Sequence, residues 1–221
     1  MSLSYFGRNQ KFGLCAIWRI EESRSFFLNE LNLPEKQIPA MEGMREIEWL
    51  ASRFLANKID QINPNEIAKD EYGKPFCKNS EIHLTISHSH DYAAYGSANH
   101  PIGIDLQIQK PKIKRIAEKY TNPEEILVLP DQFSEEEKLH LIWTIKEAVF
   151  KLYGRKELPF RKGIRIQKCA QNEKFFETIG TIIKANDKRK FACSSFLANG
   201  YYFTKAVFAP KESQWEKSLD H

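Results

Sequence analysis

Hydrophobic positions recur along this chain with two periods, and the periods predict its secondary structure. Residues 41–59 carry apolar side chains at three- and four-residue spacing, which is typical of an amphipathic helix. Residues 82–87 (Ile-His-Leu-Thr-Ile-Ser) and 102–107 (Ile-Gly-Ile-Asp-Leu-Gln) alternate with a period of two, which is typical of β-strands. In the second strand Gly103, Asp105 and Gln107 therefore share the polar face.

The other predicted elements give the chain a repeated order. Strands are predicted at 12–20, 92–97, 163–169, 174–184, 190–197 and 200–208, and helices at 22–31, 112–120, from Asn122, and from Ser134 to Gly154. A helix followed by a hairpin thus occurs twice, which favours a two-lobed α+β protein. We expect an N-terminal lobe at 1–104, a C-terminal lobe at 105–209 and a polar tail at 210–221.

Composition adds few constraints. The 221 residues are 42% hydrophobic, enough for a sizeable core, and the net charge of +4 is too small to indicate nucleic acid as a partner. A mild basic bias suits an anionic ligand or an acidic protein. The four cysteines are scattered and predicted to be reduced thiols: Cys15, Cys77, Cys169 and Cys193. The first residues lack the apolar core of a signal peptide, so we expect a cytoplasmic protein with no membrane contact.

Two carboxylates flanked by lysines are the first candidate chemistry. Asp105 lies on the polar face of its strand, and the long helix carries Glu147 between Lys146 and Lys151. Mg²⁺ in proteins commonly takes one or two carboxylates and completes its shell with substrate phosphate and water. Lysines beside such an ion neutralise charge on a departing phosphate. These residues therefore form a candidate magnesium and pyrophosphate site.

Each part of that site also has a simpler interpretation. An i, i+4 pair of Glu147 and Lys151 is common on solvated helix faces, and Lys146 fits such a face too. Asp105 could instead cap a turn at the end of its strand. Neither segment decides the matter alone.

A second candidate region lies between residues 45 and 90. Ser87 and His88 stand where a strand gives way to a turn, and could hold a phosphate oxygen or form a structural cluster. His88 and His90 could bind zinc, but no third ligand is evident. The remaining candidates could be solvated or could bind phosphate: Arg45, Arg53, and Lys74 with Pro75 in an exposed turn.

The order of these motifs resembles that of the 4′-phosphopantetheinyl transferase family. An Arg-bearing helix is followed by Glu-Tyr-Gly-Lys-Pro at 71–75, Ile-Ser-His-Ser at 86–89 and Gly-Ile-Asp at 103–105. Trp-x-x-Lys-Glu-Ala-x-x-Lys then follows at 143–151. The resemblance runs from Arg45 to Gly154 and is greatest to the long, single-chain type that activates surfactin synthetase.

The resemblance implies a fold and an activity. The fold would be a pseudo-dimer of two similar lobes, each a small antiparallel sheet packed with helices, with coenzyme A in the cleft between them. The enzyme would be a cytoplasmic monomer with holo-[acyl-carrier-protein] synthase activity. It would move phosphopantetheine from coenzyme A to a serine of an apo acyl or peptidyl carrier protein and release adenosine 3′,5′-bisphosphate. The carrier would serve fatty-acid, polyketide or nonribosomal-peptide biosynthesis.

The resemblance also implies residue roles. Asp105 and Glu147 would bind Mg²⁺ or Mn²⁺, Lys146 and Lys151 would hold the pyrophosphate, and Glu147 or a metal-bound water would take the serine proton. The other implied contacts to coenzyme A are Lys74 and Pro75 beside the adenine, and Ser87, His88 and Arg45 at the phosphates, with Arg53 as a further cofactor-binding candidate.

Gln107 departs from the family pattern, because many relatives carry Glu at this place. A neutral amide oxygen stabilises a cation less than a carboxylate, so we expect a weak third metal ligand or a water there. Gln107 also leaves open a family member that binds coenzyme A but has lost or weakened transfer.

A basic segment at 110–119 is the candidate partner surface. Its cationic residues are Lys110, Lys112, Lys114, Arg115 and Lys119. Carrier proteins are usually acidic around the modified serine, so this segment could dock one by charge steering. A solvated basic helix and a basic adaptor that only docks other proteins are the alternatives.

Overall fold

The chain divides into two compact units. The computed structural model describes residues 2–172, 174–185 and 187–209. Unit 1 covers residues 1–102 and unit 2 covers residues 103–221, where the sequence predicted a boundary between 104 and 105. The predicted polar tail at 210–221 lies outside the described residues.

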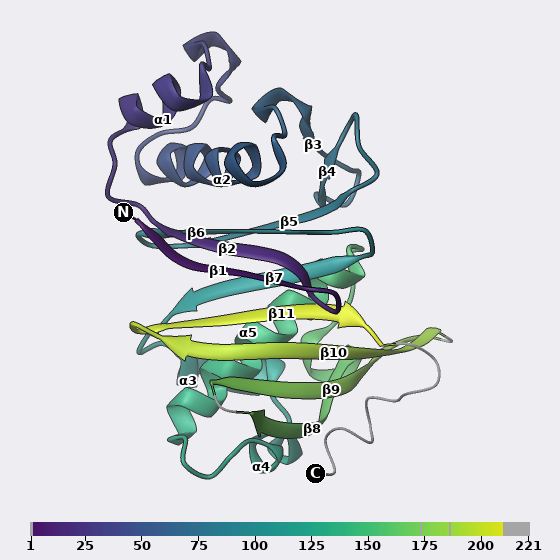
Figure 1. Ribbon diagram of the computed structural model, residues 1–221. Helices are drawn as coiled ribbons and strands as arrows, with labels where there is room; N and C mark the ends of the chain where they lie inside the picture. Colours follow the sequence, from purple (N-terminus) through teal and green to yellow (C-terminus); the bar gives the residue numbers. More distant parts are fainter. Residues whose placement is uncertain (1, 173, 186, 210–221) are drawn as a thin grey trace. The chain divides into compact units, whose positions relative to one another are not determined.

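Unit 1 is an antiparallel sheet with helices on one face (Figure 1). Its four strands run in the order β1-β2-β6-β5. The bounds are β1 Leu3–Asn9, β2 Gly13–Arg19, β5 His83–Ser89 and β6 Tyr92–Ala98, with a small second sheet of β3 Ile67–Lys69 and β4 Pro75–Cys77. The helices are α1 Arg24–Leu31 and α2 Met44–Asp60, with single 3₁₀ turns at Glu35–Gln37 and Pro64–Glu66.

The apolar stripe of α2 forms the core of unit 1. Leu50 and Ala51 are fully buried and pack in one cluster with Tyr95 of β6 and Leu84 of β5. Burial of such side chains is the main favourable contribution to folding. Three polar residues of β5 are also buried, since Thr85, Ser87 and Ser89 are 2%, 4% and 5% exposed.

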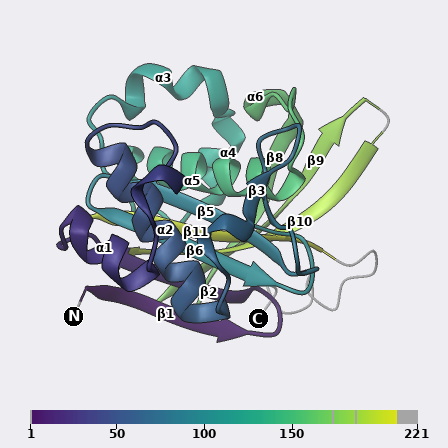
Figure 2. The same ribbon diagram turned by 90° about the horizontal axis from the view of Figure 1, so that it is seen from above.

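Unit 2 is a five-stranded sheet in the order β7-β11-β10-β9-β8. The bounds are β7 Ile102–Ile108, β8 Ile164–Asn172, β9 Phe175–Lys184, β10 Asp187–Ala198 and β11 Tyr201–Phe208. The helices are α3 Ile113–Tyr120, α4 Pro123–Val128, α5 Glu135–Tyr153 and α6 Phe160–Gly163. These helices lie together on one side of the sheet, with α5 packed against it (Figures 1 and 2).

The long helix α5 begins and ends where the sequence predicts. The Ser134 hydroxyl accepts from the Glu137 N–H and the Glu137 carboxylate accepts from the Ser134 N–H, which is a capping box. Gly154 ends the helix at φ 67°, the left-handed conformation that glycine adopts readily. Ile142, Ile145 and Val149 are fully buried in the core of unit 2.

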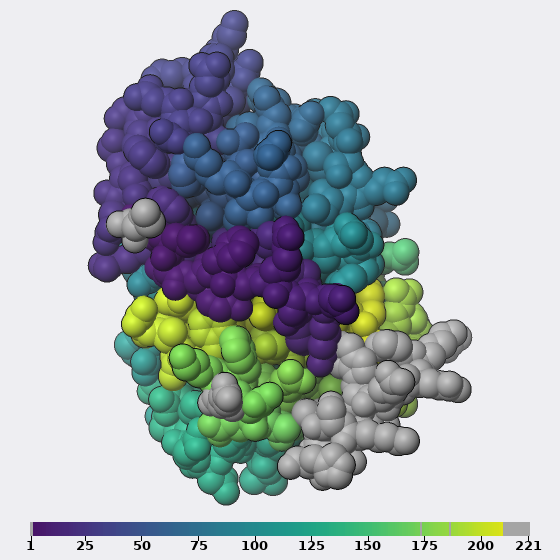
Figure 3. All heavy atoms as spheres, viewed as in Figure 1, coloured from purple at the N-terminus to yellow at the C-terminus, as the bar shows by residue number. Residues whose placement is uncertain are grey.

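The predicted α+β class is confirmed, and every predicted helix and strand is present with ends shifted by a few residues. The sequence did not predict β1, β3, β4 or α6. Among the described residues β1 is an edge strand that pairs with β2, and Leu3 and Phe6 are 43% and 55% exposed. Because an edge strand buries little, the apolar residues of β1 need not alternate. Its purple atoms lie at the surface in Figure 3.

Two further sequence expectations can be compared with the structure. All four cysteines are free thiols, as predicted. Within the described part of the chain, no helix combines the length and the apolar character needed to cross a membrane.

Candidate functional site

A close approach of β7 to α5 builds the carboxylate site of unit 2. A Cβ atom on Gly103 would lie 2.1 Å from the Ala148 carbonyl oxygen and 2.4 Å from the Leu152 nitrogen, both backbone atoms of α5. Only glycine allows such contact. Two residues later on the same face of β7, Asp105 is thereby brought beside the helix.

Asp105, Glu147 and Lys151 form one charged cluster. The Lys151 ammonium donates to Oδ1 of Asp105 at 2.8 Å, and Asp105 itself is 6% exposed. Burial and then the nearby Asp105 carboxylate raise the pKa of Glu147 to about 7, while Lys151 opposes that shift. The structure therefore brings together three of the residues that the sequence predicted for catalysis.

This cluster fits a hard divalent cation. Two carboxylates that repel each other are the donor set such an ion stabilises, and Mg²⁺ accepts as few as one or two protein carboxylates. Gln107 lies on the same face of β7 as Asp105 and is half-buried, with its amide nitrogen donating to the Ile108 carbonyl at 3.0 Å. A cation held here would keep positions for phosphate oxygens and water.

The structure adds no third ligand to the zinc site considered for His88 and His90. Nowhere in residues 2–172, 174–185 and 187–209 do three or more His, Cys, Asp or Glu side chains gather closely enough to hold a metal ion. His90 adopts the left-handed conformation at φ 51° in the turn after β5. His90 therefore belongs to the turn between β5 and β6.

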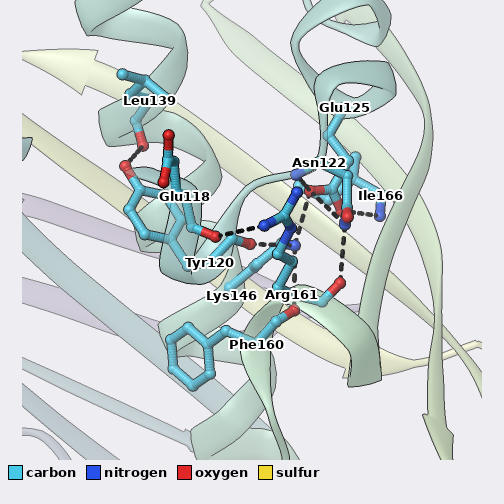
Figure 4. Close-up of polar contacts among 9 residues, drawn as sticks. All are labelled: Glu118, Tyr120, Asn122, Glu125, Leu139, Lys146, Phe160, Arg161 and Ile166. Atoms are coloured by element: carbon cyan, nitrogen blue, oxygen red, sulfur yellow. Dashed lines mark hydrogen bonds and ion pairs between the residues drawn. The ribbon is translucent and has the colours of Figure 1, made fainter. Parts of the chain in front are cut away.

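Lys146 lies in a different place from the one its predicted role requires. Its ammonium is completely buried and donates to the Tyr120 carbonyl (2.7 Å), to Oε2 of Glu125 (2.7 Å) and to the Phe160 carbonyl (3.2 Å) (Figure 4). Burial lowers its pKa to about 8, and Glu125 opposes the shift. The expectation that Lys146 holds pyrophosphate does not fit this geometry, because three protein acceptors surround a nitrogen with three protons.

In unit 1, His88 lies near an acidic residue of α2. Its Nδ1 lies 3.0 Å from Oε2 of Glu48, and the imidazole remains 52% exposed. A carboxylate at Nδ1 fixes the orientation of the ring. Ser87, the preceding residue, is buried and Arg45 is exposed. Of the predicted phosphate contacts, His88 and Arg45 are thus accessible.

Arg53 packs inside unit 1. The residue is 7% exposed, its guanidinium lies 4.4 Å from the centre of the Trp49 ring, and one terminal nitrogen donates to the Ser52 hydroxyl at 3.1 Å. Burial lowers its pKa to about 10. Its Nε is buried without a hydrogen-bond partner among the described residues, and the role of Arg53 in cofactor binding stays a prediction.

Lys74 belongs to a cluster of basic groups near the start of β4. Lys74 and Pro75 are half-buried, and the Lys74 N–H donates to Oδ1 of Asp70 at 2.8 Å. Burial lowers the pKa of Lys74. Burial first, and then Lys74 and His100, lower the pKa of His83 on β5. Lys74, His83 and His100 thus lie near one another at this end of unit 1.

The basic segment at 110–119 forms α3 and the turn before it. Its five cationic side chains are exposed: Lys110, Lys112, Lys114, Arg115 and Lys119. Ile113 is buried against the core, so the helix is anchored on its apolar face and presents charge on the other.

The sequence analysis did not single out Glu48 or Glu125. Glu125 carried a signal, since Asn122-Pro-Glu-Glu is a capping-box pattern and the structure has that box. Glu48 carried none, because its contact with His88 joins residues 40 positions apart.

Comparisons with known proteins give the site a family context. A family model described as the 4′-phosphopantetheinyl transferase superfamily matches residues 101–204. The 4′-phosphopantetheinyl transferase gsp of Aneurinibacillus migulanus is 37% identical over 112 residues, 49% of this chain and 46% of the relative. The corresponding Sfp protein of Bacillus subtilis is 29% identical over 108 residues, 47% of this chain and 48% of the relative.

A shorter relative is covered more fully. A protein named holo-[acyl-carrier-protein] synthase from Bacillus pumilus is 34% identical over 82 residues, which are 29% of this chain and 68% of the relative. The chain spans about half the length of gsp and Sfp. The segment matched by the family model contains Asp105, Glu147 and Lys151.

Proposed function

We propose a transfer function from one premise: this chain belongs to the 4′-phosphopantetheinyl transferase superfamily. The proposed reaction moves the phosphopantetheine arm of coenzyme A to a serine of an apo acyl or peptidyl carrier protein. The observation that supports it most strongly is the cluster of Asp105, Lys151 and Glu147 within the matched segment.

The reaction forms one bond and breaks another. The serine oxygen attacks the pantetheine-side phosphorus of coenzyme A, and the bond between that phosphorus and the bridging oxygen breaks. Adenosine 3′,5′-bisphosphate leaves with the bridging oxygen. The hydroxyl proton passes to Glu147 or to a water molecule.

Asp105 and Glu147 would hold Mg²⁺ or Mn²⁺, with Gln107 as a weaker third position or through a water. A divalent cation bound there would neutralise charge on the pyrophosphate oxygens as the bridging bond breaks. The Lys151 ammonium bonds the Asp105 carboxylate and would stabilise the leaving phosphate. Lys146 has no place in this scheme, because its ammonium is buried in other contacts.

For the remainder of coenzyme A we propose contacts from unit 1. Lys74 and Pro75 would border the adenine, and Arg45, Ser87 and His88 would contact phosphates. The accessible His88 ring, oriented by Glu48, and the basic cluster around Lys74 support this assignment. The basic segment at 110–119 would dock the acidic carrier.

The test is the intact mass of a panel of apo acyl and peptidyl carriers after incubation with coenzyme A, Mg²⁺ and this protein. At least one carrier should gain one phosphopantetheine, and omission of Mg²⁺ or addition of chelator should prevent the gain. The result also identifies the carrier class.

The alternative left open by Gln107, a member of the family that binds coenzyme A without transfer, is not favoured by the relatives, which are named as transferases or a synthase. Calorimetric binding of coenzyme A with no mass gain on any carrier would support this candidate over the transferase. No binding and no transfer would leave only a docking protein.

A further inference from the structure

A buried ion pair joins five elements of unit 2. The Lys146 ammonium on α5 bonds the last residue of α3, Tyr120, and the first residue of α6, Phe160. Its partner Glu125 lies on α4 and accepts from the Ile166 N–H of β8 at 3.0 Å. Figure 4 shows these groups converging on the ammonium. One charge pair thus links α3, α4, α6 and β8 to the long helix.

The charged groups of Lys146 and Glu125 are hydrogen-bonded to protein partners and are not available to a ligand. Lys146 is 0% exposed at its side chain and Glu125 2%. The second carboxylate oxygen of the pair accepts from the Asn122 N–H at 2.9 Å as well as from Lys146. Because a buried charge is tolerated only when it is paired and hydrogen-bonded, these contacts are what keep Lys146 in place.

The contact with Tyr120 has a particular consequence for α3. The last carbonyls of a helix have no partner within the helix, and a cation is favoured at that end. Lys146 supplies the cation to the C-terminal end of α3. On the N-terminal side of α4, Asn122 also donates to the Arg161 carbonyl at 2.8 Å, and Arg161 donates to the Glu118 carbonyl at 3.0 Å. The C-terminal end of α3 is therefore bonded both by Lys146 and by Arg161.

We infer that Lys146 is a positioning residue. Together with Glu125 it fixes the position of the basic helix α3 relative to Glu147. Lys146 and Glu147 are consecutive on α5, about 100° apart around the helix, so one side chain secures α3 while the other lies beside Asp105. The inference rests on the proposed function, because α3 is proposed to dock the carrier. It predicts that Lys146 governs the reaction of the carrier and has no direct part in binding coenzyme A.

The experiment compares Lys146→Met with Lys151→Met and the unchanged protein. Coenzyme A affinity is measured by calorimetry, KM for the carrier and kcat by transfer, and exchange of the Asn122 and Ile166 amides by hydrogen–deuterium exchange. Lys146→Met should leave the affinity for coenzyme A within about twofold. It should raise KM for the carrier by roughly tenfold, since docking loses orientation, and speed exchange at both amides. Lys151→Met should weaken coenzyme A binding.

Two outcomes would overturn the inference. If Lys146→Met weakens the binding of coenzyme A as much as Lys151→Met does, Lys146 contacts coenzyme A directly. If it lowers only the melting temperature while KM for the carrier and the two amides stay unchanged, its role is purely structural. Failure of the unchanged protein to modify any carrier would count against the proposed function instead, and the exchange data would still decide whether the pair holds α3.

Two further variants guard against loss of folding. Lys146→Met/Glu125→Gln removes both charges at nearly constant volume, which is often tolerated better than removing one. Phe27→Leu removes buried apolar volume from α1 of unit 1, whereas the pair lies in unit 2, and serves as a destabilised control. The double variant should repeat the rise in KM for the carrier, and the control should not.

Discussion

At the scale of single residues, the decisive contrast is between two neighbours on α5. Lys146 and Glu147 are both partly or wholly removed from solvent, yet one is neutralised by Glu125 and the other faces a second carboxylate. Burial disfavours the charged form of both side chains. For Lys146 the paired Glu125 offsets this effect, whereas for Glu147 the neighbouring Asp105 adds to it and the pKa rises.

This contrast predicts how stability depends on pH. The pKa of Glu147 is raised from 4.5 to about 7, so the folded state binds the proton more tightly than the unfolded state. Its contribution to stability is therefore present at low pH and lost as pH rises through that window. Without divalent ions, Glu147→Gln should be more stable than the unchanged protein at pH 8 and not at pH 5, by on the order of 2 kcal/mol.

Urea unfolding at both pH values, with chelator present, measures this difference. Because groups outside the cluster titrate alike in both proteins, the difference between variants reports on Glu147 and its interaction with Asp105 and Lys151. An equal free energy of unfolding for the two proteins at both pH values would show that Glu147 is not perturbed as described.

At the scale of elements, Gly103 determines how β7 and α5 meet. A Cβ at this position would overlap the carbonyl of Ala148 and the nitrogen of Leu152, and helix backbone cannot move aside as a side chain can. The Gly-Ile-Asp segment thus joins a packing requirement to a chemical one, with Asp105 two residues beyond the contact.

Gly103→Ala should therefore separate strand and helix. We expect a loss of roughly 3 kcal/mol in the free energy of unfolding and a reduced rate of transfer, because Asp105 moves away from Glu147. Ile104→Val, one buried methylene smaller on the same strand, is the control and should cost about 1 kcal/mol with transfer retained. Equal stability of both variants in urea would contradict the close approach.

Sequence periodicity was sufficient for most elements and for part of the site. Alternation located β7, and helical spacing with a capping box located α5 with its ends. Periodicity did not reveal β1, whose pattern is that of a half-exposed edge strand. Nor could it show that Lys146 is buried, because two of its acceptors are backbone carbonyls contributed by distant residues, Tyr120 and Phe160.

At the scale of the whole molecule, charge is the property that selects partners. Exposed cations on α3 and the preceding turn are anchored by a buried apolar face, while the protein carries a net charge of only +4. Attraction of an acidic carrier should therefore depend on this segment rather than on the total charge.

Reversal of Lys112, Lys114 and Arg115 to Glu should raise KM for the carrier on the order of tenfold at low salt. The effect should shrink at high salt, where exposed charges are screened, and KM for coenzyme A should not change. Lys188→Glu, an exposed reversal on β10, is the control. A similar effect from the control would indicate non-specific charge attraction.

The most direct test of the central claim is the rate of phosphopantetheine transfer to a carrier serine by the unchanged protein, Asp105→Ala and Glu147→Ala. Fragmentation of the carrier maps the attached group to serine, and circular dichroism verifies that the variants fold. We predict transfer by the unchanged protein and a loss of about a hundredfold or more in each variant. Full activity in both folded variants would contradict the assignment of the site.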